Sequence, residues 1–139
     1  MEIEFRGKIK GGDWNYGFYV VQSGVHGILT DGEIEGCDLL FVEVDPASVG
    51  MFTWRKDRNN IKIFSDDICK LSYGIPPKTD TVVIEWADDK ETVGGLAVSG
   101  WWMRNIRKGG VSGSLCKIYE PDLEIIGNVT DNPELLEVK

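Results

Sequence analysis

Short stretches of alternating apolar and polar residues, separated by glycine turns, constrain the fold of this chain more than any other feature. The clearest stretch, 14–21, places aromatic and β-branched residues at a period of two and is followed by the turn signal Ser23-Gly24. Similar stretches recur about every ten residues, and no window longer than about eight residues shows a helical period. With 17 glycines to supply the turns, the sequence predicts a mainly β fold.

The strands are expected to form two small, closely packed antiparallel β units, barrel- or sheet-like, with short helical turns. A seam from Phe64 to Asp67 would divide residues 1–64 from residues 65–139. Neither half could bury much apolar surface alone, so we expect the two to share one core. The 139 residues are also few enough to count as a single domain.

Several local patterns sharpen this expectation. Asp45-Pro46 and Asn132-Pro133 each place a capping residue before a proline, which predicts a short helical turn. Gly27, inside a strand pattern, indicates a bulge or a close contact. The segment 114–127 is predicted to form two strands around a turn at 120–122.

The charge balance restricts the class of partner. The net charge is −8, whereas a general nucleic-acid binder needs cations to displace counterions from phosphate. The same balance argues against docking on an anionic membrane. Six acidic residues and no Lys or Arg lie between Asp31 and Asp45, which predicts a solvated loop leading into a strand. A surface that imitates nucleic acid to occupy a host protein is a narrower alternative.

Metal and cofactor sites are not expected. Cys37, Cys69 and Cys116 are widely spaced and odd in number, and His26 is the only histidine, so neither a disulfide framework nor a zinc site of the usual kind is predicted. No stretch approaches the ~18 apolar residues of a membrane span, and the start lacks the apolar run of a signal peptide. These features predict a cytoplasmic protein with reduced thiols and no cofactor.

Three segments along nearly the whole chain resemble the YopX family of phage and prophage proteins. They are Phe5-Arg-Gly-Lys8 followed by Trp14-Asn-Tyr16-Gly-Phe18-Tyr; Val44-Asp-Pro-Ala-Ser-Val-Gly50-Met-Phe-Thr53 followed by Lys56-Asp57 and Asp67-Ile68; and Glu124-Ile-Ile-Gly-Asn128 followed by Asn132-Pro-Glu-Leu-Leu136. The resemblance implies a mainly β fold, a phage or prophage origin in a Gram-positive-type bacterial host and possible self-association. It implies no catalytic residue.

This chain departs from the family pattern at three places where the family has glycine. Trp54, Asn60 and Asp66 stand there instead. Asn60 can adopt the left-handed backbone conformation that glycine would. Trp54 is a large change of size and suggests a contact particular to this member.

A candidate partner contact surrounds Trp101 and Trp102. Neighbouring residues on a strand face opposite ways, so one indole can enter the core while the other stays on the surface. Arg104, Arg107 and Lys108 follow beside a glycine-rich loop, and an aromatic anchor with a cationic rim is typical of a binding edge. With Trp54, these residues form the predicted contact, and we expect Trp102→Ala to weaken binding without loss of the fold.

Two other groups of residues suggest different chemistry. The aromatic side chains of 14–19 could stack nucleic-acid bases, although Lys8 and Lys10 are the only cations close in sequence, and a core or subunit-interface role is preferred. The acid pairs Asp66-Asp67 and Asp88-Asp89 could serve a small hydrolase, but they fit solvated turns better.

The sequence thus favours a non-catalytic protein that acts by contact with a second copy of itself or with a host protein. The alternative is a nucleic-acid-associated small β module.

Overall fold

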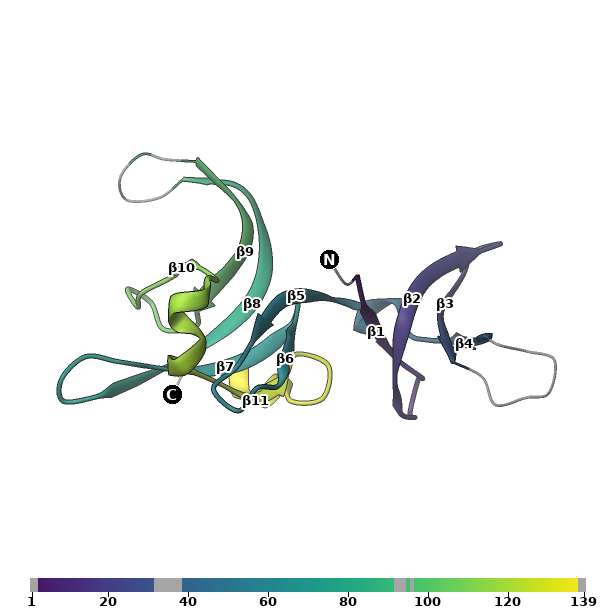
Figure 1. Ribbon diagram of the computed structural model, residues 1–139, viewed down its shortest axis with the longest axis horizontal. Helices are drawn as coiled ribbons and strands as arrows, with labels where there is room; N and C mark the ends of the chain where they lie inside the picture. The colour runs from purple at the N-terminus through teal and green to yellow at the C-terminus, as the bar shows by residue number, and fades with distance from the viewer. Residues whose placement is uncertain (1–2, 32–38, 92–94, 96, 138–139) are drawn as a thin grey trace. The chain divides into compact units, whose positions relative to one another are not determined.

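A computed structural model describes residues 3–31, 39–91, 95 and 97–137 of the chain. The described residues form strands and short 3₁₀ helices (Figure 1). The strands are β1 (Phe5–Lys8), β2 (Trp14–Gln22), β3 (Val25–Asp31), β4 (Leu39–Glu43), β5 (Gly50–Lys56), β6 (Lys62–Phe64), β7 (Asp67–Tyr73), β8 (Lys78–Glu91), β9 (Ala97–Asn105), β10 (Gly113–Ser114) and β11 (Leu123–Asn128). The 3₁₀ helices are η1 (Pro46–Ser48), η2 (Lys117–Asp122) and η3 (Pro133–Leu136).

The strands assemble into two antiparallel sheets, which confirms the predicted mainly β class. One sheet has the order β4-β3-β2-β1-β5-β6 and the other the order β10-β9-β8-β7-β11. Over the residues described, both sheets are open, with an edge strand at each end. The sequence had left barrel and sheet as alternatives, and the structure gives open sheets.

The chain divides into two compact units, residues 1–52 and residues 53–139. The boundary falls within β5 rather than at the predicted seam near Phe64. The reason lies in the packing of Ile63, which is fully buried in the core of the second unit and therefore carries β6 with it. The shared core expected from the sequence stays a prediction.

The first unit is built on a tight hairpin between β2 and β3. Ser23 and Gly24 form its turn, and both have positive φ angles, as a turn that matches the twist of two strands requires. Ile28 and Val44 are buried beneath Gly7, where a Cβ atom would meet Val44 Cγ2 at 2.7 Å. The missing side chain of Gly7 lets this small core close.

The second unit holds the larger core. Its buried residues come from β6, from the five-stranded sheet and from the segment before η2: Ile63, Cys69, Leu71, Val82, Ile84, Met103, Leu115 and Leu123. Tyr73, Trp101, Tyr119 and Ile125 pack against this core from its margins. Of the two strands predicted around the 120–122 turn, the second is confirmed as β11, whereas the first is wrong, since residues 117–122 form η2 instead and Tyr119 packs against the core from there.

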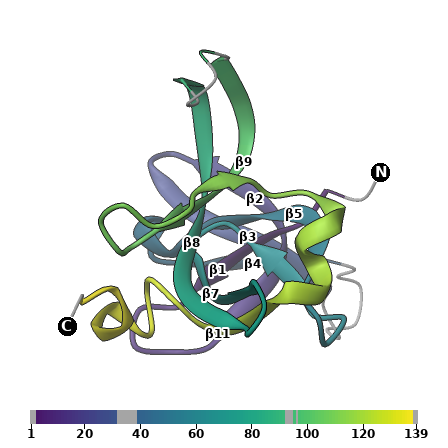
Figure 2. The same ribbon diagram turned by 90° about the vertical axis from the view of Figure 1, so that its left-hand side faces the viewer.

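β8 and β9 extend beyond the neighbouring strands as a curved two-stranded arm (Figures 1 and 2). The register pairs Trp86 with Trp101 and then shifts between Ala87 and Lys90 before the arm continues. Asp88 and Asp89 therefore lie within a long strand, and the turn predicted for them is wrong. The register shift accommodates Asp88 and Asp89, and pairing with β9 continues on both sides of them.

The predicted helical turns are confirmed. The side chain of Asp45 accepts a hydrogen bond from Ala47 N at 3.0 Å and caps η1. Asn132 precedes η3 but does not cap it, because its Oδ1 accepts a hydrogen bond from Asn128 N instead.

The three positions where this chain departs from the glycine pattern share one backbone feature. Trp54, Asn60 and Asp66 have φ angles of 62°, 63° and 69°. All three therefore adopt the left-handed conformation that favours glycine, which confirms the expectation for Asn60.

No helix in the described part of the chain is long and apolar enough to cross a membrane. Cys69 and Cys116 carry free thiols, while Cys37 and residues 32–38 of the predicted acidic loop lie outside the described residues.

Candidate interaction surface

The most exposed apolar surface of the first unit lies on one face of β2, β3 and β4. Phe18 pairs with Leu29, and Leu29 pairs with Phe41, so the three side chains form a row across the strands on one face. Tyr16 and Leu39 extend the same face, because side chains two residues apart on a strand point the same way. The exposed fractions are 46% for Tyr16, 57% for Phe18, 48% for Leu39 and 42% for Phe41. We call these five residues the apolar face.

Two glycines let the apolar face take this form. A Cβ atom on Gly27 would lie 2.3 Å from Phe41 Cζ, so the absence of a side chain lets the Phe41 ring cover this position. This confirms the close contact predicted for Gly27. At Gly17 a Cβ atom would lie 1.9 Å from the carbonyl oxygen of Leu29, and only glycine allows the two strands to approach there.

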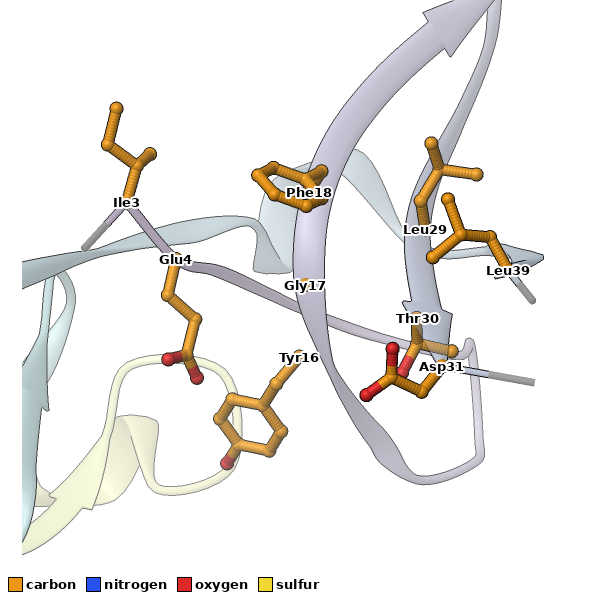
Figure 3. Close-up of a pocket in the computed structure, with 9 residues that line it drawn as sticks. All are labelled: Ile3, Glu4, Tyr16, Gly17, Phe18, Leu29, Thr30, Asp31 and Leu39. Atoms are coloured by element: carbon orange, nitrogen blue, oxygen red, sulfur yellow. The ribbon is translucent and has the colours of Figure 1, made fainter. Parts of the chain in front are cut away.

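A hollow of about 380 Å³ opens on the apolar face (Figure 3). It is lined by Ile3, Glu4, Tyr16, Gly17, Phe18, Leu29, Thr30, Asp31 and Leu39. In the view of Figure 3 the Phe18 ring lies between Ile3 on one side and Leu29 and Leu39 on the other. The hollow therefore combines apolar walls with two carboxylates, and contains no Lys or Arg among its lining residues.

The four aromatic residues predicted as one platform are divided between the two faces of the sheet. Tyr16 and Phe18 belong to the apolar face, and Trp14 lies on the same side of β2, with its ring centroid 4.7 Å from the guanidinium carbon of the buried Arg6. Tyr19 points to the opposite face, where its hydroxyl is hydrogen-bonded to Nδ1 of His26. The core role expected for Tyr16 and Phe18 is wrong because both are exposed, whereas the interface role stays a prediction.

The second unit contains the tryptophan pair singled out in the sequence. Trp102 is only 6% exposed, so its selection as a partner contact is wrong: its side chain lies on the opposite face from Trp101 and is covered there. Trp101 is half-buried and packs against the main core. The expected division of the two indoles between core and surface is thus replaced by two indoles that both pack, on opposite faces.

Trp86 is the exposed tryptophan of this region, and the sequence reading missed it. It lies opposite Trp101 in the register, with ring centroids 5.2 Å apart in an edge-to-face arrangement and 58% of its surface exposed. The signal was present in the alternation of 81–86, which places Trp86 on the same face as Val82 and Ile84 but at the end of that apolar row.

The cations of the predicted contact have separate environments. Arg104 pairs with Glu85 on the neighbouring strand at 3.1 Å, and both side chains are partly exposed. Lys108 is exposed in the turn after β9. Arg107 is committed to Asp80, donating from Nε to Oδ1 at 3.2 Å and from Nη2 to Oδ2 at 3.0 Å.

The Asp80 carboxylate organises the loop after β9. Besides Arg107, it accepts hydrogen bonds from Asn105 Nδ2 at 2.8 Å and from the Tyr73 hydroxyl at 3.1 Å. The hydrogen bonds from Arg107 contribute most to lowering the pKa of Asp80 to about 2, against the opposing effect of burial. The same pair raises the pKa of Arg107. Arg107 therefore has a structural role that the sequence did not indicate.

Trp54, the remaining predicted contact residue, is half-buried in β5 with φ at 62°. The hydroxyl of Thr53 bridges its backbone, donating to Ile63 O at 2.7 Å and accepting from Arg55 N at 3.3 Å. The contact predicted for Trp54 stays a prediction, while its backbone is fixed by Thr53.

Two buried acidic side chains accept hydrogen bonds from backbone N–H groups. Asp67, predicted to be a solvated turn residue, is buried and accepts from Phe64 N at 2.8 Å, so that prediction is wrong. Asp57 is also buried and accepts hydrogen bonds from three backbone N–H groups: Asn59 N, Ile61 N and Ile125 N. In the part of the chain that the structure describes, no group of three His, Cys, Asp or Glu side chains could hold a metal ion.

Fold and surface together define a small, mainly β protein with two open antiparallel sheets and an exposed apolar face beside carboxylates. A family comparison identifies the chain further: it belongs to the YopX protein family, whose model matches residues 19–137. The match covers the second and third segments on which the resemblance was based, while most of the first segment precedes it. No curated protein matches the chain.

Proposed function

We propose that this YopX-family chain is a non-catalytic accessory protein of a phage or prophage that acts in the bacterial cytoplasm by protein contact. The contact is with a second copy of the chain or with a host protein. The observation that supports this most directly is the apolar face, where Tyr16, Phe18, Leu39 and Phe41 are each more than two-fifths exposed. Contiguous exposed aromatic and aliphatic side chains of this kind are typical of protein-binding surfaces.

The arrangement of the face favours a protein partner over a nucleic acid. Base-stacking surfaces are accompanied by cations that follow the phosphate backbone. Here the hollow beside Phe18 is lined by the carboxylates of Glu4 and Asp31. The alternative of a nucleic-acid-associated module would place phosphate near these groups, and electrostatic repulsion opposes it.

The proposal is tested with Phe18→Ser, which removes the most exposed ring of the apolar face. Native mass across a concentration series and recovery of proteins from a host lysate are compared for the full wild-type chain and the variant. The matched control is Ile118→Ser, which removes an exposed apolar side chain from the second unit.

We expect the wild type and Ile118→Ser to self-associate or recover the same partner, and Phe18→Ser to do neither while its circular dichroism spectrum is unchanged. A wild-type chain that is monomeric throughout, with a recovery profile identical to that of Phe18→Ser, would overturn the proposal. A gel shift with single-stranded nucleic acid that weakens steeply with salt would favour the nucleic-acid alternative.

A further inference from the structure

β4 ends the first sheet without the lysine, proline or bulge that often protects an edge strand. Natural edges carry Lys or Pro, or are interrupted by a bulge, because an open edge pairs readily with another strand. The five residues of β4, Leu-Leu-Phe-Val-Glu, include no Lys and no Pro. The register with β3 is continuous from Leu39 to Glu43. In the part of the chain that the structure describes, β4 is the last strand of its sheet, so this edge can accept an added strand.

The hydrogen-bonding pattern shows which groups of β4 point outward. Val44 N donates to His26 O at 3.0 Å, and the register continues with Val42 opposite Ile28. Because bonded and non-bonded pairs alternate in an antiparallel ladder, the backbone groups of Leu39, Phe41 and Glu43 point away from β3. The side chains of the same three residues are exposed, so an added strand would meet both.

Negative charge brackets the apolar centre of this edge. Glu43 stands at one end of β4, and Asp31 lies beside Leu39 at the other end, with Phe41 between them. The two ends of β4 are about 13 Å apart at the usual strand rise. An added strand would find an aromatic residue at its centre and a carboxylate towards each end.

The charge of the first unit reinforces this pattern. Residues 1–52 include nine Asp and Glu but three Lys and Arg, a net charge of −6 out of −8 for the whole chain. A second copy would bring the same carboxylates to the same edge, whereas a cationic segment would be attracted to it.

We infer that β4 binds an extended segment of another protein as an added antiparallel strand, and that this segment has an apolar centre flanked by Lys or Arg. The inference rests on the proposed function and specifies its partner. Backbone hydrogen bonds from Leu39, Phe41 and Glu43 would provide the pairing, and the side chains of Phe41, Asp31 and Glu43 the selectivity.

The probe is a fluorescein-labelled synthetic peptide with the central order Lys-Val-Tyr-Val-Lys, titrated with the full chain and followed by fluorescence anisotropy. Its tyrosine would lie opposite Phe41. Three companion peptides are titrated in the same way. In the first, Glu replaces both Lys; in the second, the backbone nitrogen of Tyr is methylated; in the third, the backbone nitrogens of both Val are methylated. Of the methylated nitrogens, only that of Tyr would face β4 in the added strand, whereas those of both Val would face away, so the two methylated peptides form a matched pair.

Two charge reversals give the protein-side test. Glu43→Lys acts at the edge, and Asp13→Lys makes the same change of net charge at an exposed residue in the turn between β1 and β2. We expect the basic peptide to bind and the acidic one not to bind. Glu43→Lys and methylation of Tyr should each weaken binding about tenfold or more, and Asp13→Lys and methylation of Val much less.

Equal binding of the basic and acidic peptides, or equal loss with the two methylated peptides, would overturn the inference. A second result would also overturn it: the wild type is a dimer, Phe41→Ser dissociates this dimer, and the peptide does not. A second copy of the chain would then occupy this edge. If the peptides fail while Phe18→Ser still abolishes partner recovery, the edge inference is refuted and the proposed function stands.

Discussion

The carboxylate of Asp80 and the guanidinium of Arg107 form a two-point ion pair, with donor–acceptor distances of 3.2 Å and 3.0 Å. Asp80 lies on β8, whereas Arg107 follows β9, so the pair fixes the loop after β9 to the sheet. Asn105 and Tyr73 donate to the same carboxylate. Loss of its negative charge should therefore loosen the loop and the strand end together.

The folded-state pKa of Asp80, about 2, lies below its ordinary value of 3.8. A group with a lowered pKa contributes stability above its unfolded-state pKa, and that contribution is lost as the pH falls through the folded-state value. The stabilisation from Asp80 should be complete above pH about 4 and lost towards pH about 2.

Urea unfolding of the wild type and Asp80→Asn at a series of pH values provides the measurement. Taking the difference cancels the titration of the other carboxylates. The wild type should be the more stable at pH 5 to 7, and the difference should shrink as the pH falls towards 2. A difference that stays constant over this range would show that the charge of Asp80 adds nothing to stability.

Asp57 predicts a larger effect on stability at neutral pH. Its buried carboxylate accepts from the N–H groups of Asn59, Ile61 and Ile125, which joins the turn before β6 to β11. Asp57→Ala would leave these three backbone donors without their buried acceptor, and we expect a loss of about 2–4 kcal/mol in the free energy of unfolding. The control Asp122→Ala removes an exposed carboxylate and should change stability by less than about 0.5 kcal/mol. Equal effects in urea unfolding would contradict the role given to Asp57.

Truncating Trp102 and truncating Trp86 should both lower stability, but by different amounts. The Trp102 side chain is only 6% exposed, so Trp102→Ala would leave a cavity in its place. We expect this to lower the free energy of unfolding by about 3–5 kcal/mol. Trp86→Ala removes an exposed ring that contacts Trp101 edge to face and should cost about 1 kcal/mol. Chemical denaturation of both variants checks this. A Trp102→Ala chain as stable as the wild type would restore the surface role first predicted for Trp102.

The period-two pattern was enough to predict the fold class, because alternation and glycine turns act locally. Strand ends were less predictable where long-range packing overrode local signals. The acidic sequence at Asp88-Asp89 resembles a turn, yet pairing with β9 carries β8 through it. Proline at 121 indicates a turn, whereas packing of Tyr119 against the core favours η2.

The surface was harder to predict than the fold, since exposure depends on which strands cover which face. Adjacent positions of Trp101 and Trp102 showed that they point opposite ways, but not that both faces of β9 are covered. The same limit concealed the apolar face: Tyr16 and Phe18 have the composition of a core strand, and only the sheet order leaves them exposed.

Trp54 offers a direct test of backbone strain. In an ordinary strand position Gly is less stable than Ala by roughly 0.5–1 kcal/mol, because Gly loses more conformational freedom on folding. With φ at 62°, Trp54 occupies a conformation that costs a residue with a Cβ atom about 1–2 kcal/mol.

Trp54→Gly and Trp54→Ala both delete the indole, so the difference in stability between them isolates the backbone contribution. We expect the usual order to invert, with Trp54→Gly more stable than Trp54→Ala by about 1 kcal/mol in urea unfolding. Asn60→Gly and Asn60→Ala, at φ 63°, should show the same order with a similar gap, because the wild-type side chain cancels from the difference between the two variants. If Trp54→Ala proved the more stable, the bridge from Thr53 would not be holding residue 54 in the left-handed conformation.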